Sequence, residues 1–186
     1  MRKSFYEKYF CFVSPLKIPL ENGSFFYYVP FEKTIQAAFV NKSWTFHIHK
    51  PNNSQDDVLR DYFDGDSYKT NVFFQENPNA IPIILYQDGF ELVCPIGPAS
   101  NLKHKVIGVY MAFGNLPSHI RFKKDFIQLV ALCKSCDFNP SEVYGRIVYD
   151  MMKVQECGVQ VENFGTVKAG LAFIAGDNLG SHGLAG

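Results

Sequence analysis

The pattern of hydrophobic and polar positions becomes regular after residue 80 and predicts three successive strands. Residues 81–86 form an almost continuous β-prone run that leads into Asp88 and Gly89, which is typical of a buried strand followed by a turn. Residues 90–96 could extend this strand or start another. Residues 106–113 and 126–133 are further apolar runs of strand length with polar flanks, and we interpret them as the second and third strands. We expect these three strands to form an antiparallel meander.

A helix and a fourth strand are predicted next. The apolar residues of the helix recur at steps of three and four, at Val143, Ile147, Val148, Met151 and Val154. Ser141 can cap this helix and Gly158 can end it. Residues 167–175 then predict a strand that runs toward Asp177. Because a helix between strands is usually a right-handed crossover, we expect this strand to lie parallel to an earlier one, in an α/β fold.

The first 80 residues have a different pattern, with many aromatic residues and turn formers and little periodicity. Residues 50–66 are polar and turn-rich, with one short helical possibility at residues 56–63. We interpret residues 1–80 as an irregular, aromatic-rich lead-in or covering segment, and residues 81–186 as the α/β core.

Composition limits the partners and the location. The 186 residues are 47% hydrophobic, and 18 acidic residues balance 18 basic ones, so we expect one folded domain without overall charge. Binding to DNA would then have to rest on local basic patches. We expect no membrane span, because no apolar run reaches the roughly 18 residues that a membrane helix needs. The start of the chain has no signal-type apolar core, so we expect the nucleus or the cytoplasm and no secretion.

Two aspartates are the main candidates for chemistry. If the fourth strand lies beside the first and parallel to it, Asp88 and Asp177 both fall near the carboxyl ends of neighbouring strands, where open sheets bind ligands. Two carboxylates so placed could bridge divalent ions, with Mg²⁺ or Mn²⁺ favoured by oxygen ligands. Each aspartate precedes Gly or Asn, so the alternative is an ordinary turn residue.

Basic residues next to predicted strand ends are candidates for DNA contacts. The densest groups are Lys103, His104 and Lys105, followed by Arg121, Lys123 and Lys124. These side chains could meet a phosphate backbone, and the alternative is that they are solvated flanks of the strands.

Other polar candidates carry weaker signals. His47 and His49 would share one side of an extended segment and could seat a metal, but surface alternation explains them as well. His182 lies near Asp177 in the sequence, where a frayed terminus is the alternative. Five scattered cysteines favour a reducing compartment. Cys133 and Cys136 form a Cys-x-x-Cys pair without a second pair at zinc-finger spacing, so we interpret them as ordinary thiols.

Five short motifs follow one another along the chain in the same order as in a known protein family. They are IILYQDGFELVCPIG at residues 83–97, KHKVIGVY at 103–110, GNLP at 114–117, LVALCKSCD at 129–137 and GDNLGSH at 176–182. Together they resemble the transposase-derived proteins of animal genomes that are related to CACTA (En/Spm) DNA transposons. YYVP at residues 27–30 and VLRDYFDG at 58–65 resemble the lead-in of the same family.

This resemblance implies a ribonuclease-H-like catalytic core. Its three antiparallel strands, helix and parallel fourth strand agree with the order read above, with Asp88 as the first metal-binding carboxylate and Asp177 as the second. In the family the core continues to a third acidic residue, whereas this sequence stops at Gly186, and neither Glu91 nor Glu162 can be assigned that role. We therefore expect a partial core, with its fourth strand as a sheet edge that promotes self-association.

Three hypotheses follow for function. The first is the remnant of a metal-dependent DNA transposase domain, inactive as this chain, in which Asp88 and Asp177 would hold Mg²⁺ or Mn²⁺ during attack on a DNA phosphodiester. The second is a non-enzymatic DNA- or protein-binding module domesticated from a transposon. The third is a fragment without a selected role.

Overall fold

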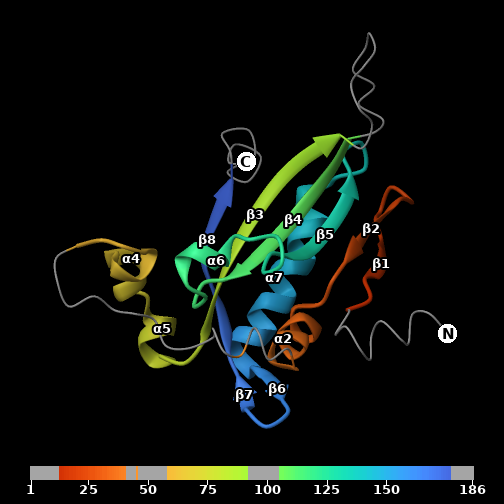
Figure 1. Ribbon diagram of the computed structural model, residues 1–186. Coiled ribbons are helices and arrows are strands. Elements are labelled where there is room, and N and C mark those ends of the chain that lie inside the picture. The colour runs from red at the N-terminus through yellow and green to blue at the C-terminus, as the bar shows by residue number, and fades with distance from the viewer. Residues whose placement is uncertain (1–12, 41–44, 46–57, 92–104, 177–186) are drawn as a thin grey trace.

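The structure, a computed structural model, describes residues 13–40, 45, 58–91 and 105–176 and is built around a mixed sheet of six strands (Figure 1). The strands follow the order β1-β2-β5-β4-β3-β8 across the sheet. Their bounds are Leu16–Pro19 for β1, Phe25–Tyr28 for β2, Gln128–Lys134 for β5, Lys105–Phe113 for β4, Ile81–Glu91 for β3 and Ala169–Gly176 for β8. A short hairpin of β6 (Val159–Val161) and β7 (Gly165–Val167) forms a second sheet.

Four strands of this sheet agree with the sequence prediction. β3, β4 and β5 are antiparallel neighbours, and β8 runs parallel to β3 after the intervening helix. No turn interrupts the chain after residue 86: β3 continues through Asp88 and Gly89 to Glu91, which agrees with the alternative that residues 90–96 extend the first strand. Every residue of β3 from Ile83 to Glu91 is paired with β4, and this ladder of hydrogen bonds outweighs the local turn preference of Asp-Gly.

The predicted helix is α7 (Pro140–Cys157), which packs against β8 and the core. Its buried side chains are Val143, Ile147, Met151 and Val154, whereas Val148 is exposed. Ser141 is not the cap: Asn139 caps the helix by accepting a hydrogen bond of 3.1 Å from the backbone N–H of Ser141. Gly158 ends the helix as expected, with a φ of 70° that favours glycine.

Residues 16–40 are more regular than the sequence predicted, which corrects the interpretation of the lead-in as irregular. β2 pairs with β5, and α2 (Phe31–Val40) contributes Phe31 and Ile35 to the same hydrophobic core. In β2 the side chains of Phe26 and Tyr28 are buried, and those of Phe25 and Tyr27 are not. All four residues of β2 are aromatic, so the alternation of a half-buried strand is hidden in the sequence.

Short helices cover the start of β3 and β8. They are η1 (Tyr62–Asp64), α4 (Asp66–Lys69) and α5 (Val72–Glu76). Only the 3-10 turn η1 falls within the described part of the helix expected at residues 56–63. Phe73 of α5 lies against Gly170 of β8, where a β-carbon would collide with its ring. α6 (Ser118–Arg121) follows β4.

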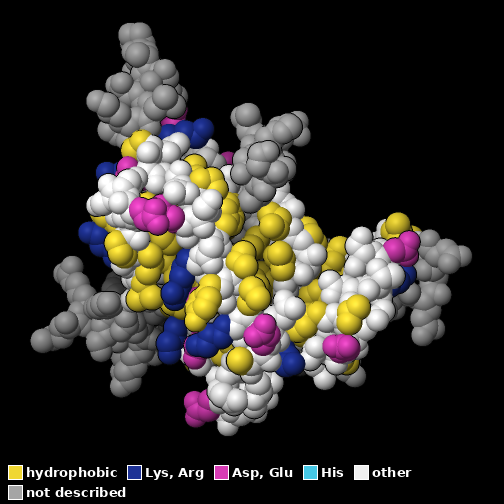
Figure 2. All heavy atoms as spheres, turned by 180° about the vertical axis from the view of Figure 1, so that it is seen from behind, with side chains coloured by type: hydrophobic (Ala, Val, Ile, Leu, Met, Phe, Trp, Pro, Cys, Tyr) yellow, Lys and Arg dark blue, Asp and Glu magenta, His cyan; other side chains and the backbone are white. Residues whose placement is uncertain are grey.

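The helix α7 also contributes hydrophobic side chains to the surface of the molecule. Figure 2 shows hydrophobic side chains among charged ones on this side of the molecule, and Tyr149 and Met152 of α7 are exposed.

Of the helices that the structure describes, none combines the length and the apolar character that crossing a bilayer requires.

Candidate functional site

Asp88 lies on the face of the sheet that is opposite α7. The hydroxyl of Tyr144 on α7 donates a hydrogen bond to Oε1 of Gln87, so Gln87 faces the helix. Successive side chains of a strand point to opposite faces, which places Tyr86 and Asp88 together on the other one. We call the surface of β3 and β4 that carries Tyr86, Asp88 and Tyr110 the Asp88 face.

Tyr110 is the neighbour of Asp88 on this face. Asp88 is paired with Gly108 of β4, and a β-carbon on Gly108 would lie 2.5 Å from the hydroxyl oxygen of Tyr110. Only glycine leaves room there for the phenol to fold back toward Asp88. Burial raises the pKa of Tyr110, and the nearby charges of Asp88 and Tyr86 raise it further. Tyr110 is therefore a neutral hydrogen-bond donor beside the carboxylate.

The pairing of β8 with β3 shows how the chain leads toward Asp177, the second predicted metal-binding carboxylate. Tyr86 is level with Ala175, and Gln87 is level with Gly176. The residues that come next in the sequence are Asp88 and Asp177. Asp177 lies outside the described residues, so its meeting with Asp88 stays a prediction.

The fit to a divalent metal is partial. Asp88 offers the oxygen ligands that Mg²⁺ and Mn²⁺ prefer, but within residues 13–40, 45, 58–91 and 105–176 no three acidic, His or Cys side chains gather as a metal site. Glu91 lies three residues beyond Asp88 on the same strand, and alternation places it on the α7 side. Glu162 is exposed in the β6–β7 turn, at the end of the sheet where β3 begins (Figure 1).

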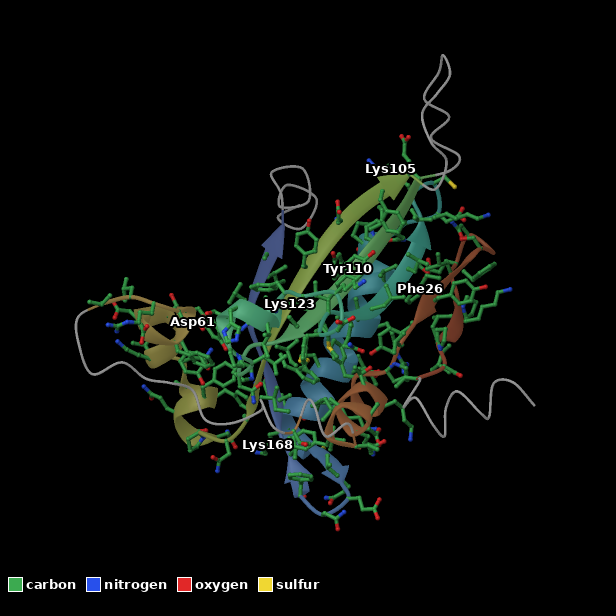
Figure 3. The ribbon with its side chains drawn as sticks, viewed as in Figure 1. Phe26, Asp61, Lys105, Tyr110, Lys123 and Lys168 are labelled. Carbon is green, nitrogen blue, oxygen red and sulfur yellow. The ribbon has the colours of Figure 1, made fainter. Side chains whose placement is uncertain are left out.

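The predicted basic residues do not form one group. Lys105 begins β4, whereas Lys123 and Lys124 are exposed in the segment between α6 and β5, and Figure 3 shows Lys123 apart from Lys105. Lys103 and His104 lie outside the described residues.

Arg121 requires a correction. Its side chain is buried, and its guanidinium donates hydrogen bonds of 2.8 and 2.6 Å to the two carboxylate oxygens of Asp61. A guanidinium so engaged is withdrawn from the surface, so the assignment of Arg121 to DNA binding is not kept.

The remaining sequence candidates carry little chemistry. Cys133 and Cys136 are free thiols, the first buried and the second exposed. Burial raises the pKa of Cys133 to about 11, and the charges of Asp137, Cys136 and Glu142 add to this. A thiol with such a pKa is a poor nucleophile at neutral pH. His47, His49 and His182 lie outside the described residues.

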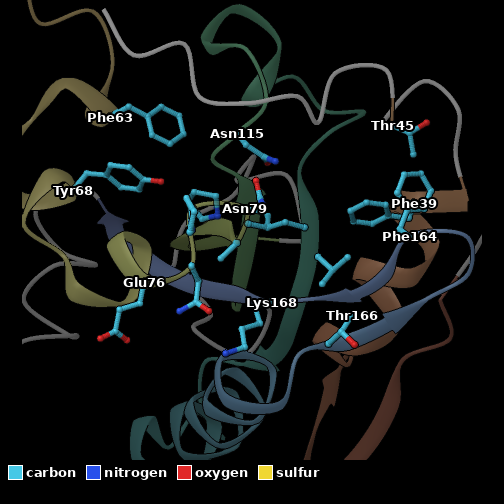
Figure 4. A pocket seen from close by; sticks show the side chains of 16 residues that line it. Phe39, Thr45, Phe63, Tyr68, Glu76, Asn79, Asn115, Phe164, Thr166 and Lys168 are labelled. Atoms are coloured by element: carbon cyan, nitrogen blue, oxygen red, sulfur yellow. The ribbon is translucent and has the colours of Figure 1, made fainter. Parts of the chain in front are cut away.

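A cavity that the sequence did not predict lies at the start of β3 (Figure 4). It has a volume of about 710 Å³, and Phe63, Tyr68 and Asn115 are among the residues that line it. The Oδ1 atom of Asn115 is buried without a hydrogen-bond partner among the described residues. Ile81 and Pro82 also line the cavity, so it lies at the opposite end of β3 from Asp88 and does not belong to the same site.

A smaller pocket was also missed, and it lies on the Asp88 face. Its volume is about 200 Å³, and its lining includes Tyr86, Tyr110 and Phe122. One feature of the sequence is consistent with this pocket. All three residues are aromatic, and each lies in or next to an apolar segment that is followed by polar residues. Their proximity depends on strand register, which the pattern alone does not fix.

Comparison with known proteins gives one result: no protein-family model, no curated protein and no solved structure matches this chain.

Proposed function

We propose that the chain derives from the catalytic domain of a metal-dependent DNA transposase, with a ribonuclease-H-like core. The observation that carries this proposal is the parallel register of β3 and β8, in which Gln87 is level with Gly176. Asp88 and Asp177 follow these two residues directly, and ligands of open sheets bind at the carboxyl ends of such strands. The strand order β5-β4-β3-β8 supports the same ancestry.

In this proposal Asp88 and Asp177 hold Mg²⁺ or Mn²⁺. A divalent cation bound there would polarise a phosphoryl oxygen of DNA. The chain's own residues have the remaining roles: Asp88 supplies a carboxylate from a rigid strand, and Tyr110 supplies a neutral hydroxyl beside it. Lys123 and Lys124, both exposed, contact the phosphate backbone.

A second candidate function is DNA binding without cleavage. The observation that favours it is the exposed run of Phe122, Lys123 and Lys124, which can bind a nucleic acid without any metal. Binding through these lysines would weaken with salt, because neutralising phosphates releases counterions.

Nicking of supercoiled plasmid in the presence of Mn²⁺ tests the first function. Any nicking that the full chain retains is expected to be abolished by Asp88→Asn and by Asp177→Asn, since both carboxylates would hold the cation. The matched control is Glu162→Gln, which removes an exposed carboxylate far from Asp88 and is expected to nick like the parent. Nicking that survives both aspartate substitutions would exclude these residues as metal ligands. Salt-dependent binding without nicking would favour the second function.

A further inference from the structure

The pocket on the Asp88 face is formed by three strands and the loop after α6. Tyr86 comes from β3, Tyr110 from β4 and Ala175 from β8, and Phe122 closes the pocket from the end of α6. The rings of Tyr86 and Tyr110 lie 6.5 Å apart with a tilt of 32° between their planes. The pocket is thus a shallow, ring-lined depression in a rigid sheet.

The aromatic residues around this pocket remain open to solvent. The exposed fraction is 38% for Tyr86 and 56% for Phe122. Exposed rings on a sheet are the surfaces on which unpaired bases stack, because every base has a flat π face. Bases in duplex DNA are already stacked on each other, so a single strand fits this surface better.

Two lysine residues adjoin Phe122 in the sequence. Lys123 and Lys124 directly follow Phe122 in the sequence, and both are exposed; the side chain of Lys123 is labelled in Figure 3. A nucleotide that stacks at Phe122 would bring its phosphates within reach of these side chains. The combination of aromatic rings with a basic flank is the general design of surfaces that bind single strands.

We propose that the Asp88 face binds single-stranded DNA, with an unpaired base stacked on Tyr86 and Phe122 and the adjoining phosphates on Lys123 and Lys124. The choice of DNA rests on the proposed function, but the stacking itself requires no metal. Asp88 shares this face with Tyr86, so a strand held there would run past the predicted metal ligand.

Fluorescence anisotropy of the full chain with a labelled 16-nucleotide thymidine strand, in buffer with EDTA, tests this proposal. We expect Tyr86→Ala and Phe122→Ala each to weaken binding by about 5-fold or more. Tyr86→Phe keeps the ring and is expected to bind like the parent, which separates stacking from loss of fold. Lys123→Gln with Lys124→Gln is expected to lower the salt dependence.

Two further controls make the result decisive. Tyr149→Ala removes an equally large exposed ring from α7, on the other side of the sheet, and is expected to leave binding unchanged. The same strand annealed to its complement is expected to bind more weakly. Unchanged affinity of both alanine variants on the Asp88 face, or duplex binding as tight as that of the single strand, would overturn the proposal. Because EDTA excludes cleavage, a chain that fails to nick plasmid can still bind the strand, so the two proposals fail separately.

Discussion

Arg121 at the end of α6 binds Asp61, which lies 60 residues earlier in the chain, through both oxygens of the carboxylate. Arg121 as a whole is 3% exposed, and its Nε donates a third hydrogen bond of 3.0 Å to the backbone oxygen of Leu116. It also lies over the ring of Tyr62, at 5.1 Å from the ring centre. The side chain of Arg121 therefore links Asp61, at the start of η1, to the loop that follows β4.

Removing the negative charge from this ion pair is expected to destabilise the fold strongly. Asp61→Asn keeps a side-chain oxygen that can accept from the N–H of Tyr62, as Asp61 does at 2.8 Å, but leaves Arg121 buried without a counter-charge. We expect a loss of about 3 kcal/mol in the free energy of unfolding, measured by urea denaturation. The exposed Asp66→Asn is the matched control and is expected to change stability by less than about 0.5 kcal/mol. Equal stabilities of the two variants would contradict this account of Arg121.

The role of Arg121 illustrates what the sequence could not supply. Its position near Lys123 and Lys124 suggested a basic surface group, and its partner is distant in the chain. Charge type is readable from sequence, but burial and pairing depend on tertiary contacts. The same limit applies to the pocket on the Asp88 face, whose rings come together only through the register of β3 and β4.

The strands of the core were more predictable. β4, β5 and β8 agree with the apolar runs of strand length that the sequence shows. The extent of β3 was underestimated, since the turn preference of Asp88 and Gly89 is local and the pairing with β4 is not. The helix α2 was missed because Val29 and Pro30 precede it where a Ser, Thr, Asp or Asn cap would mark its start, although Asn41 follows its last residue.

Stability is expected to fall at alkaline pH because tyrosines that are partly or fully buried resist ionisation. Burial raises the pKa of Tyr144 to about 12, whereas the unfolded chain has the ordinary value of about 10. The folded state then holds the proton to higher pH than the unfolded state does. This contribution is complete below pH 10 and is lost as the pH rises from about 10 to about 12.

Urea midpoints measured between pH 8 and pH 12 check this expectation. Burial also raises the pKa of Tyr28 and of Tyr62, so they should add to the same decline. Tyr144→Phe is expected to flatten the pH dependence above pH 10, although it gives up the hydrogen bond to Gln87. The exposed Tyr149→Phe serves as the control and should follow the parent protein. A parallel fall of the Tyr144→Phe and parent midpoints would argue against this assignment.

The two thiols of the Cys-x-x-Cys pair are expected to differ in reactivity. Cys133 is buried with its pKa raised to about 11, and Cys136 is exposed. Iodoacetamide at pH 8 should therefore alkylate Cys136 in the native protein and Cys133 only after denaturation. Trypsin cleavage after Lys134 places the two residues on separate peptides for mass spectrometry. Equal native labelling of both peptides would show that Cys133 is not protected by burial.

The two edges of the main sheet differ in how well they resist pairing with another chain. β1 forms one edge and is only four residues long, with Lys17 and Pro19 as residues that discourage further pairing. β8 forms the other edge among the described strands, and its eight residues carry neither charge nor proline. Ile174 of β8 is 46% exposed. Edge strands of this kind tend to pair with other chains.

We therefore predict that the protein self-associates through β8 as its concentration rises, because two uncharged edges can pair without repulsion. Ile174→Lys places a charge at this edge and is expected to shift the chain toward the monomer in sedimentation-velocity experiments. Tyr149→Lys adds the same charge to an exposed site on α7 and should leave the association unchanged. A monodisperse monomer for the parent chain at high concentration would refute the prediction. An equal effect of both lysines would point instead to a general effect of net charge on solubility.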